Sequence, residues 1–123
     1  MMRKIRVYVD TSVFGGVEDE EFGVPSQRFF QRVRGGDFIV LISQITEQEL
    51  SRAPARVQRV LRELPSHGLV FVPAGSEVMT LAQAYLDANI VGSSSVADAL
   101  HVATATVAGA DLILSWNFRH IVN

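Results

Sequence analysis

The feature that most constrains the fold is a short apolar run, residues 5–9, that ends at an acidic residue. All of its side chains except Arg6 are apolar, which is typical of a strand covered on both faces of a sheet. Asp10 follows at the carboxyl end of this strand, where the functional crevice of an open α/β sheet lies, and is therefore a candidate site residue. Asp, Thr and Ser are also common in turns and as helix caps. The motif formed by Asp10, Thr11 and Ser12 alone therefore leaves both a functional and a structural interpretation open.

Apolar runs and helix-length segments alternate along the rest of the chain. Three further runs are predicted as strands, at residues 38–42, 69–72 and 112–114. Helices are predicted between them, over about residues 25–34, 44–53, 54–64, 76–90 and 96–108. Residues 13–16 are predicted as a loop. This order predicts an α/β fold, in which a mostly parallel central sheet carries helices on both faces.

Composition narrows the classes of function. The net charge of −2 gives no global sign of a nucleic-acid surface or of an acidic-membrane partner, so nucleic-acid binding would rest on a local basic patch. The absence of cysteine excludes disulfides, thiolate zinc sites and cysteine nucleophiles. The sequence shows no secretory signal pattern and no apolar run of membrane-spanning length. We therefore expect a cytoplasmic protein without a membrane partner.

Polar residues recur where the predicted elements meet the carboxyl edge of the sheet. Four of them follow a strand or lie early in a helix there: Asp10, Glu49, Asp98 and Asn117. Three carboxylates and an amide oxygen crowded together repel one another unless a cation is present, and oxygen ligands suit Mg²⁺ or Mn²⁺. Such ions support phosphodiester hydrolysis, because they activate water and neutralise charge on the phosphate.

Each of these residues also has an ordinary structural explanation. Asp98 near a helix start suits the helix macrodipole without a metal, Glu49 could be solvent-exposed, and Asn117 could be a turn residue. Asp111 begins its strand, so we interpret it as a structural residue at the opposite edge of the sheet. His101, one turn after Asp98, is interpreted as a buried packing residue in preference to one that lines the cleft.

Four segments, taken together, resemble the PIN-domain ribonuclease family, which includes the VapC-type toxins of toxin–antitoxin pairs. They occur in the family's order over nearly the whole chain: Val9-Asp10-Thr11-Ser12, Glu49-Leu50, Asp98-Ala99-Leu100-His101-Val102-Ala103-Thr104-Ala105 and Ser115-Trp116-Asn117-Phe118. The third segment is the most specific of the four. The resemblance implies a PIN-like three-layer sandwich, and the organisation of the chain predicts a single domain over residues 1–123. The sequence stops soon after the fourth predicted strand, where a last, C-terminal edge strand would be expected.

The resemblance also implies roles for individual residues. The positions that match the family's acidic metal ligands are Asp10, Glu49 and Asp98, which are also the expected catalytic residues together with Asn117. Asn117 stands where many members have a fourth acid, so this chain has one negative charge fewer and a weaker second metal position. Three hydroxyl residues match positions that order the site: Thr11, Ser12 and Ser115.

The activity implied by the resemblance is Mg²⁺- or Mn²⁺-dependent cleavage of single-stranded RNA by a homodimer. A small antitoxin protein is the implied partner if the protein is a toxin. Arg52 and Arg119 are the residues that we expect to contact RNA phosphates, because they lie close in sequence to Glu49 and Asn117.

Two other functions compete with this one. An aspartate-nucleophile phosphatase typically needs a second aspartate two residues after Asp10 and a lysine late in the chain, but the sequence has Ser12 and a single lysine, Lys4. A catalytically inactive PIN-like scaffold that only binds a partner is the alternative that Asn117 favours. The joint retention of the three carboxylates argues against that alternative.

Overall fold

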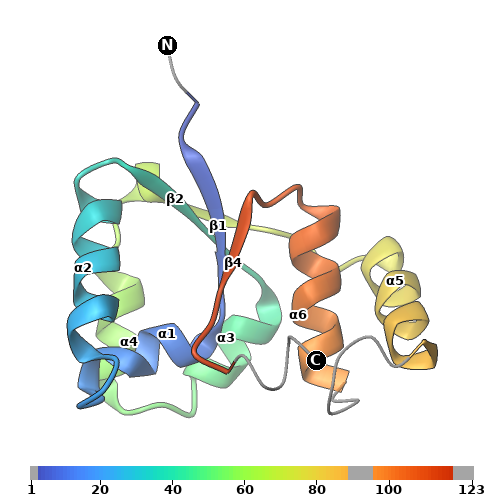
Figure 1. The fold of residues 1–123 in the computed structure, drawn as a ribbon, viewed down its shortest axis with the longest axis horizontal. Helices are drawn as coiled ribbons and strands as arrows, with labels where there is room; N and C mark the ends of the chain where they lie inside the picture. The colour runs from blue at the N-terminus through green and yellow to red at the C-terminus, as the bar shows by residue number, and fades with distance from the viewer. Residues whose placement is uncertain (1–2, 89–95, 118–123) are drawn as a thin grey trace.

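The computed structural model describes residues 3–88 and 96–117, and a four-stranded sheet forms its centre. The strands are β1 (Ile5–Val9), β2 (Phe38–Ile42), β3 (Leu69–Phe71) and β4 (Leu112–Leu114). All pairings are parallel and the strand order is β3-β2-β1-β4, which confirms the parallel sheet predicted from the sequence. β1 is an inner strand, so its carboxyl end lies between β2 and β4 (Figure 1).

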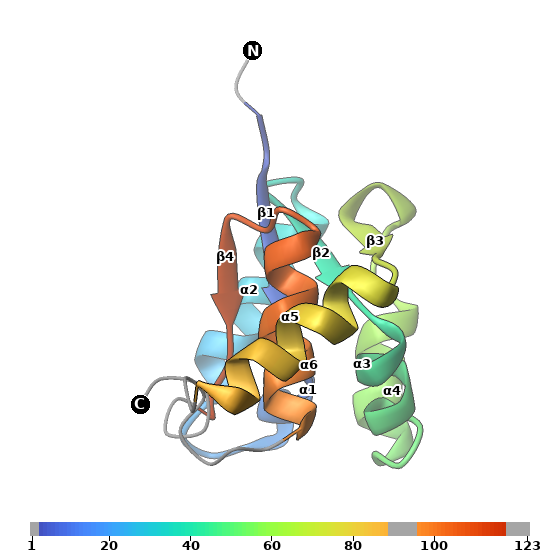
Figure 2. The ribbon, with the colours of Figure 1, turned by 90° about the vertical axis from the view of Figure 1, so that its right-hand side faces the viewer.

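The helices form layers on the two faces of this sheet. The α-helices in the described residues are α1 (Thr11–Gly15), α2 (Gly23–Arg34), α3 (Gln44–Leu50), α4 (Ala55–Arg62), α5 (Ser76–Asp87) and α6 (Val96–Val107). α2 and α4 cover one face, α6 covers the other, and α5 packs on the outer side of α6 (Figures 1 and 2). α1 and α3 lie at the end of the sheet that the first turn of α6 also reaches (Figure 1). Within the described ranges, no helix has the length and apolar character needed to cross a membrane.

The side chains of β1 alternate between the two halves of the core. Val7 and Val9 pack on the side of α2, in a cluster that contains Phe14 and Phe30. Tyr8 points to the opposite side, where it packs with residues of β2 and α6. These β1 side chains are 0–2% exposed, as expected for an inner strand of a parallel sheet that is covered on both faces.

The structure contains a helix where the sequence predicts a loop. α1 follows Asp10 directly, and its start is explained by the Asp10 carboxylate, which accepts the backbone N–H of Ser12 as an N-cap. Its packing is explained by Val13 and Phe14, which are both fully buried. The prediction for residues 13–16 is therefore wrong, because tertiary burial and the cap override the low helix propensity of the glycine pair.

The boundaries of the remaining elements lie close to the prediction. α2 begins at Gly23, ahead of Pro25, which is possible because proline is tolerated in the first turn of a helix. Gly109 follows α6 with a φ of 70°, a left-handed conformation that favours glycine at a helix end. The helix break predicted at residues 91–92 lies outside the described residues.

Candidate functional site

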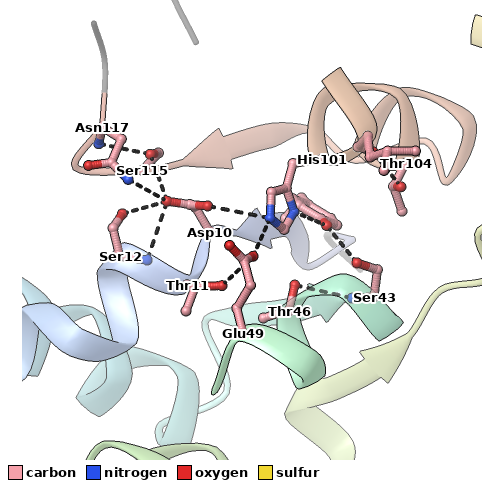
Figure 3. A network of polar contacts seen from close by, with 12 residues as sticks. Asp10, Thr11, Ser12, Ser43, Thr46, Glu49, His101, Thr104, Ser115 and Asn117 are labelled. Atoms are coloured by element: carbon pink, nitrogen blue, oxygen red, sulfur yellow. Dashed lines mark hydrogen bonds and ion pairs between the residues drawn. The ribbon is translucent and has the colours of Figure 1, made fainter. Parts of the chain in front are cut away.

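The carboxyl edge of the sheet gathers polar side chains from four parts of the chain. Asp10 follows β1 and caps α1, Glu49 lies in the second turn of α3, and His101 lies in the second turn of α6. Ser115 and Asn117 follow β4. Figure 3 shows the side chains of Asp10, Glu49 and His101 pointing toward one another. The elements therefore bring together residues that are up to 107 positions apart in the sequence.

Asp10 is 6% exposed, and its carboxylate is fixed through one oxygen. Oδ2 accepts hydrogen bonds from the Ser12 hydroxyl at 2.6 Å, the Ser115 hydroxyl at 3.1 Å and the Asn117 amide at 3.5 Å. The backbone N–H of Ser12 donates to the same oxygen at 3.3 Å. The other oxygen, Oδ1, lies 3.7 Å from His101 Nε2, on the side where Glu49 lies. The serines and the asparagine thus hold Asp10 so that Oδ1 faces the other acidic residue.

Glu49 is held in a similar way, although its side chain is 41% exposed. Its Oε1 accepts hydrogen bonds from the Thr11 hydroxyl at 2.9 Å and from His101 Nε2 at 2.7 Å. Both bonds fall on one oxygen, which leaves Oε2 unengaged by the described residues. The hydrogen bond from His101, with a smaller contribution from Thr11, lowers the pKa of Glu49 below its ordinary value in spite of partial burial. Glu49 is therefore a carboxylate at neutral pH.

The lowered pKa of Glu49 predicts a pH dependence of stability. Because the unfolded chain binds a proton to Glu49 at a higher pH than the folded chain does, the stabilisation is fully present above the ordinary pKa and is lost as the pH falls through the folded value. We expect Glu49→Gln to flatten the acid limb of the curve of unfolding free energy against pH. Urea unfolding between about pH 6 and pH 3, a range around the ordinary glutamate value of roughly 4.3, measures this. Parallel curves for the two proteins would contradict the expectation.

His101 is buried, as predicted from the sequence, but it is also part of the site. It is 2% exposed, and its two ring nitrogens contact Glu49 and Tyr8, with Nδ1 at 2.6 Å from the Tyr8 hydroxyl. Burial raises the pKa of Tyr8, so its hydroxyl keeps the proton. Sequence reasoning missed both contacts. The available signal was the spacing of three residues between Asp98 and His101, which places both on one helix face.

The donor set fits a divalent cation. Candidate ligand atoms of Asp10, Glu49 and His101 all lie within 4.8 Å of one another. The carboxylates are the hard oxygen ligands that Mg²⁺ and Mn²⁺ prefer, and each has one oxygen outside the hydrogen bonds that fix it. Asp98 lies in the first turn of α6 and is half-buried, and this group of three does not include it.

Of the other residues discussed from the sequence, only some lie at this site. Asn117 is at the site, with its backbone N–H bonded to Ser115 Oγ at 2.9 Å and its amide facing Asp10. Arg52 is exposed in the connection between α3 and α4, just after Glu49, and Arg119 lies outside the described residues. Asp111 is at the opposite edge, where it accepts hydrogen bonds from the Arg3 side chain and the Arg6 backbone, as expected for a structural residue.

Trp116 anchors the segment that carries Ser115 and Asn117. Its indole N–H donates to Ser26 Oγ in α2 at 3.0 Å, and its ring stacks on Phe22 with a centroid distance of 4.9 Å. Gly16 makes room for this contact, since a Cβ at that position would lie 2.7 Å from the indole nitrogen. The donors to Asp10 are therefore tied to the helix layer on one face of the sheet.

Comparison with family models agrees with this arrangement, because the PIN domain matches residues 7–120. The chain belongs to the PIN domain family. The match begins within β1, at Val7, and continues through the segment after β4, so both ends of the site lie within the PIN domain. PIN domains are generally metal-dependent nucleases, which agrees with an acidic site that fits a divalent ion. A comparison with curated proteins found no match.

Proposed function

We propose that this PIN domain is an Mg²⁺- or Mn²⁺-dependent endoribonuclease that hydrolyses phosphodiester bonds of single-stranded RNA. The observation that carries the proposal is the paired orientation of two carboxylates. Asp10 and Glu49 are each tied through one oxygen, and their remaining oxygens, Oδ1 and Oε2, are available at the same edge of the sheet. Two carboxylates whose candidate ligand atoms lie within 4.8 Å of each other repel, and a bound cation removes that repulsion.

The residues of the chain have separate tasks in this proposal. Asp10 and Glu49 hold the ion directly. Asp98, which lies outside that group in the first turn of α6, joins them through water. Such an ion supplies, when bound, an activated water and positive charge beside the phosphate. Thr11, Ser12 and Ser115 orient the carboxylates. Arg52 and Arg119 would contact RNA phosphates beside the site.

Asn117 has a role of its own in the proposal. Its amide nitrogen lies 3.5 Å from Asp10 Oδ2, so it donates to the oxygen that is turned away from Glu49. An aspartate at this position would place a second negative charge beside Asp10, whereas the asparagine supports the carboxylate without repelling it. Asparagine in place of aspartate at position 117 is therefore compatible with a site that binds one cation firmly.

The biological setting that we propose is that of a VapC-type toxin of a toxin–antitoxin pair, active in the cytoplasm as a homodimer and inhibited by a small antitoxin protein. Exposed apolar side chains that such an assembly would cover include Phe71 at 54% and Met79 at 56%. Support for the nuclease comes from the site alone and does not depend on this biological setting.

The nuclease part of the proposal predicts metal-dependent cleavage by the purified protein. Labelled single-stranded RNA should be cut at internal positions with Mg²⁺ or Mn²⁺ and should stay intact with EDTA, since the carboxylates need the ion to activate water. Gel analysis of parallel reactions measures this, with double-stranded RNA and single-stranded DNA as competitor substrates. Intact RNA under all metal conditions, with the protein folded, would support the binding scaffold instead.

A further inference from the structure

A chain of buried hydrogen bonds runs from the start of α3 through the core to Glu49. The Tyr8 hydroxyl lies 2.9 Å from Ser43 Oγ and 2.6 Å from His101 Nδ1. On the other side of the ring, Nε2 lies 2.7 Å from Glu49 Oε1 (Figure 3). Tyr8 and Ser43 are 0% exposed, and Ser43 is itself fixed by a capping box with Thr46. The imidazole is therefore held from behind by the rigid core.

The direction of the bond to Glu49 follows from the chemistry of the partners. An ionised carboxylate only accepts hydrogen bonds, so the nitrogen at 2.7 Å from Oε1 must carry a hydrogen. The Tyr8 hydroxyl can either donate to Nδ1 or accept from it, because Ser43 Oγ completes its second hydrogen bond in both cases. Nε2 is thus a donor to Glu49 whether the ring is neutral or charged.

The effect on Glu49 is to choose which oxygen is free. Glu49 lies on a seven-residue helix with its side chain 41% exposed, so on its own it would sample several rotamers. The Thr11 hydroxyl approaches Oε1 from α1 and His101 approaches the same atom from α6, at 2.9 and 2.7 Å. Two donors from different elements on a single oxygen leave Oε2 as the oxygen that can face a cation.

We propose that His101, braced by Tyr8, is a positioning residue that holds Glu49 through Nε2–H and thereby directs Glu49 Oε2 toward the cation. The inference rests on the proposed function, because the cation is the one assigned to that site. It differs from a role for His101 as a third ligand, which would require an unprotonated Nε2 and would break the bond to Glu49. Partners of ligands in other metal sites act in this way, and their loss typically weakens metal binding by about 10–100-fold.

Calorimetric titration with Mn²⁺ in the absence of RNA tests this role in the full chain. His101→Leu should weaken Mn²⁺ binding by about 10–100-fold, and His101→Gln, whose amide can still donate, should retain most of the affinity. Tyr8→Phe removes only the brace and should weaken binding less than His101→Leu does. Tyr85→Phe and His67→Gln are matched controls outside the site and should bind as the wild type does.

A second measurement reads the proton directly and does not depend on how the variants fold. NMR of the ¹⁵N-labelled imidazole should show a hydrogen on Nε2 of His101, both before and after addition of Mg²⁺. Loss of that hydrogen on addition of Mg²⁺ would overturn the inference, because His101 would then be a ligand. Equal Mn²⁺ affinities for folded His101→Leu and wild type would overturn it as well. If the wild type bound no Mn²⁺ at all, the proposed metal-dependent activity would fail first, whatever the state of Nε2.

Discussion

Asp10→Asn is expected to abolish metal-stimulated RNA cleavage, with a loss of at least about 100-fold, while the protein stays folded. The substituted amide can keep its oxygen among the hydroxyls of Ser12 and Ser115, so the fold around the cap is maintained. Its NH₂ group then takes the place of Oδ1, which removes a charged ligand and puts a donor where the cation should bind. A loss of this size corresponds to roughly 3 kcal/mol of transition-state stabilisation.

The measurement is initial cleavage rates of labelled RNA at saturating Mn²⁺, with circular dichroism to confirm folding. Asp111→Asn is the matched control, because Asp111 lies at the opposite edge of the sheet and bonds to Arg3 and Arg6. That variant should cut RNA at the rate of the wild type. Equal rates for Asp10→Asn and wild type would show that the activity does not come from this site.

Phe14→Ala is expected to cause the largest loss of stability among single changes near the site, about 3–5 kcal/mol. Phe14 is fully buried in α1, and its ring packs on Phe30 of α2 with a centroid distance of 5.0 Å. The substitution leaves a cavity between the two helices that rigid neighbours fill only in part. Since a small domain is stable by only about 5–15 kcal/mol, this is a large fraction of the total.

Urea unfolding followed by circular dichroism measures the change, with the slope of the transition checked for two-state behaviour. Val24→Ala is the control, because Val24 is a first-turn residue of α2 that is 59% exposed and should change stability by less than about 0.5 kcal/mol. A loss below about 1 kcal/mol for Phe14→Ala would mean that α1 is not part of the cooperative core.

The sequence is sufficient to predict the sheet and the edge at which the candidate site residues gather. Apolar runs such as residues 38–42, and residues 5–9 apart from Arg6, identify inner parallel strands, because a strand covered on both faces buries the side chains on both of its sides. Once the strands are known to be parallel, the acid after β1 and the asparagine after β4 must lie at one edge. The approach of Asn117 to Asp10 follows from this rule.

The contacts that complete the site could not be predicted in the same way. His101 and Tyr8 are both buried, and burial alone is the commoner fate of such residues in an apolar helix or strand. Their roles depend on the lateral distance between α6 and β1, which brings the ring within 2.6 Å of the Tyr8 hydroxyl. Helix α1 could not be predicted for a related reason. Its residues are helical mainly because Phe14 is buried in the core.

The four hydrogen bonds to Asp10 Oδ2 also have a thermodynamic consequence. Ordering a mobile side chain at the moment of binding costs about 0.5–1.5 kcal/mol, and a loosely held carboxylate would lose that rotational entropy each time a ligand arrives. In Asp10 this entropy is lost when the chain folds, because Ser12, Ser115 and Asn117 already hold the carboxylate in one orientation. Binding at Oδ1 therefore carries a smaller entropic penalty, and its enthalpy and entropy should resemble those of a preformed receptor.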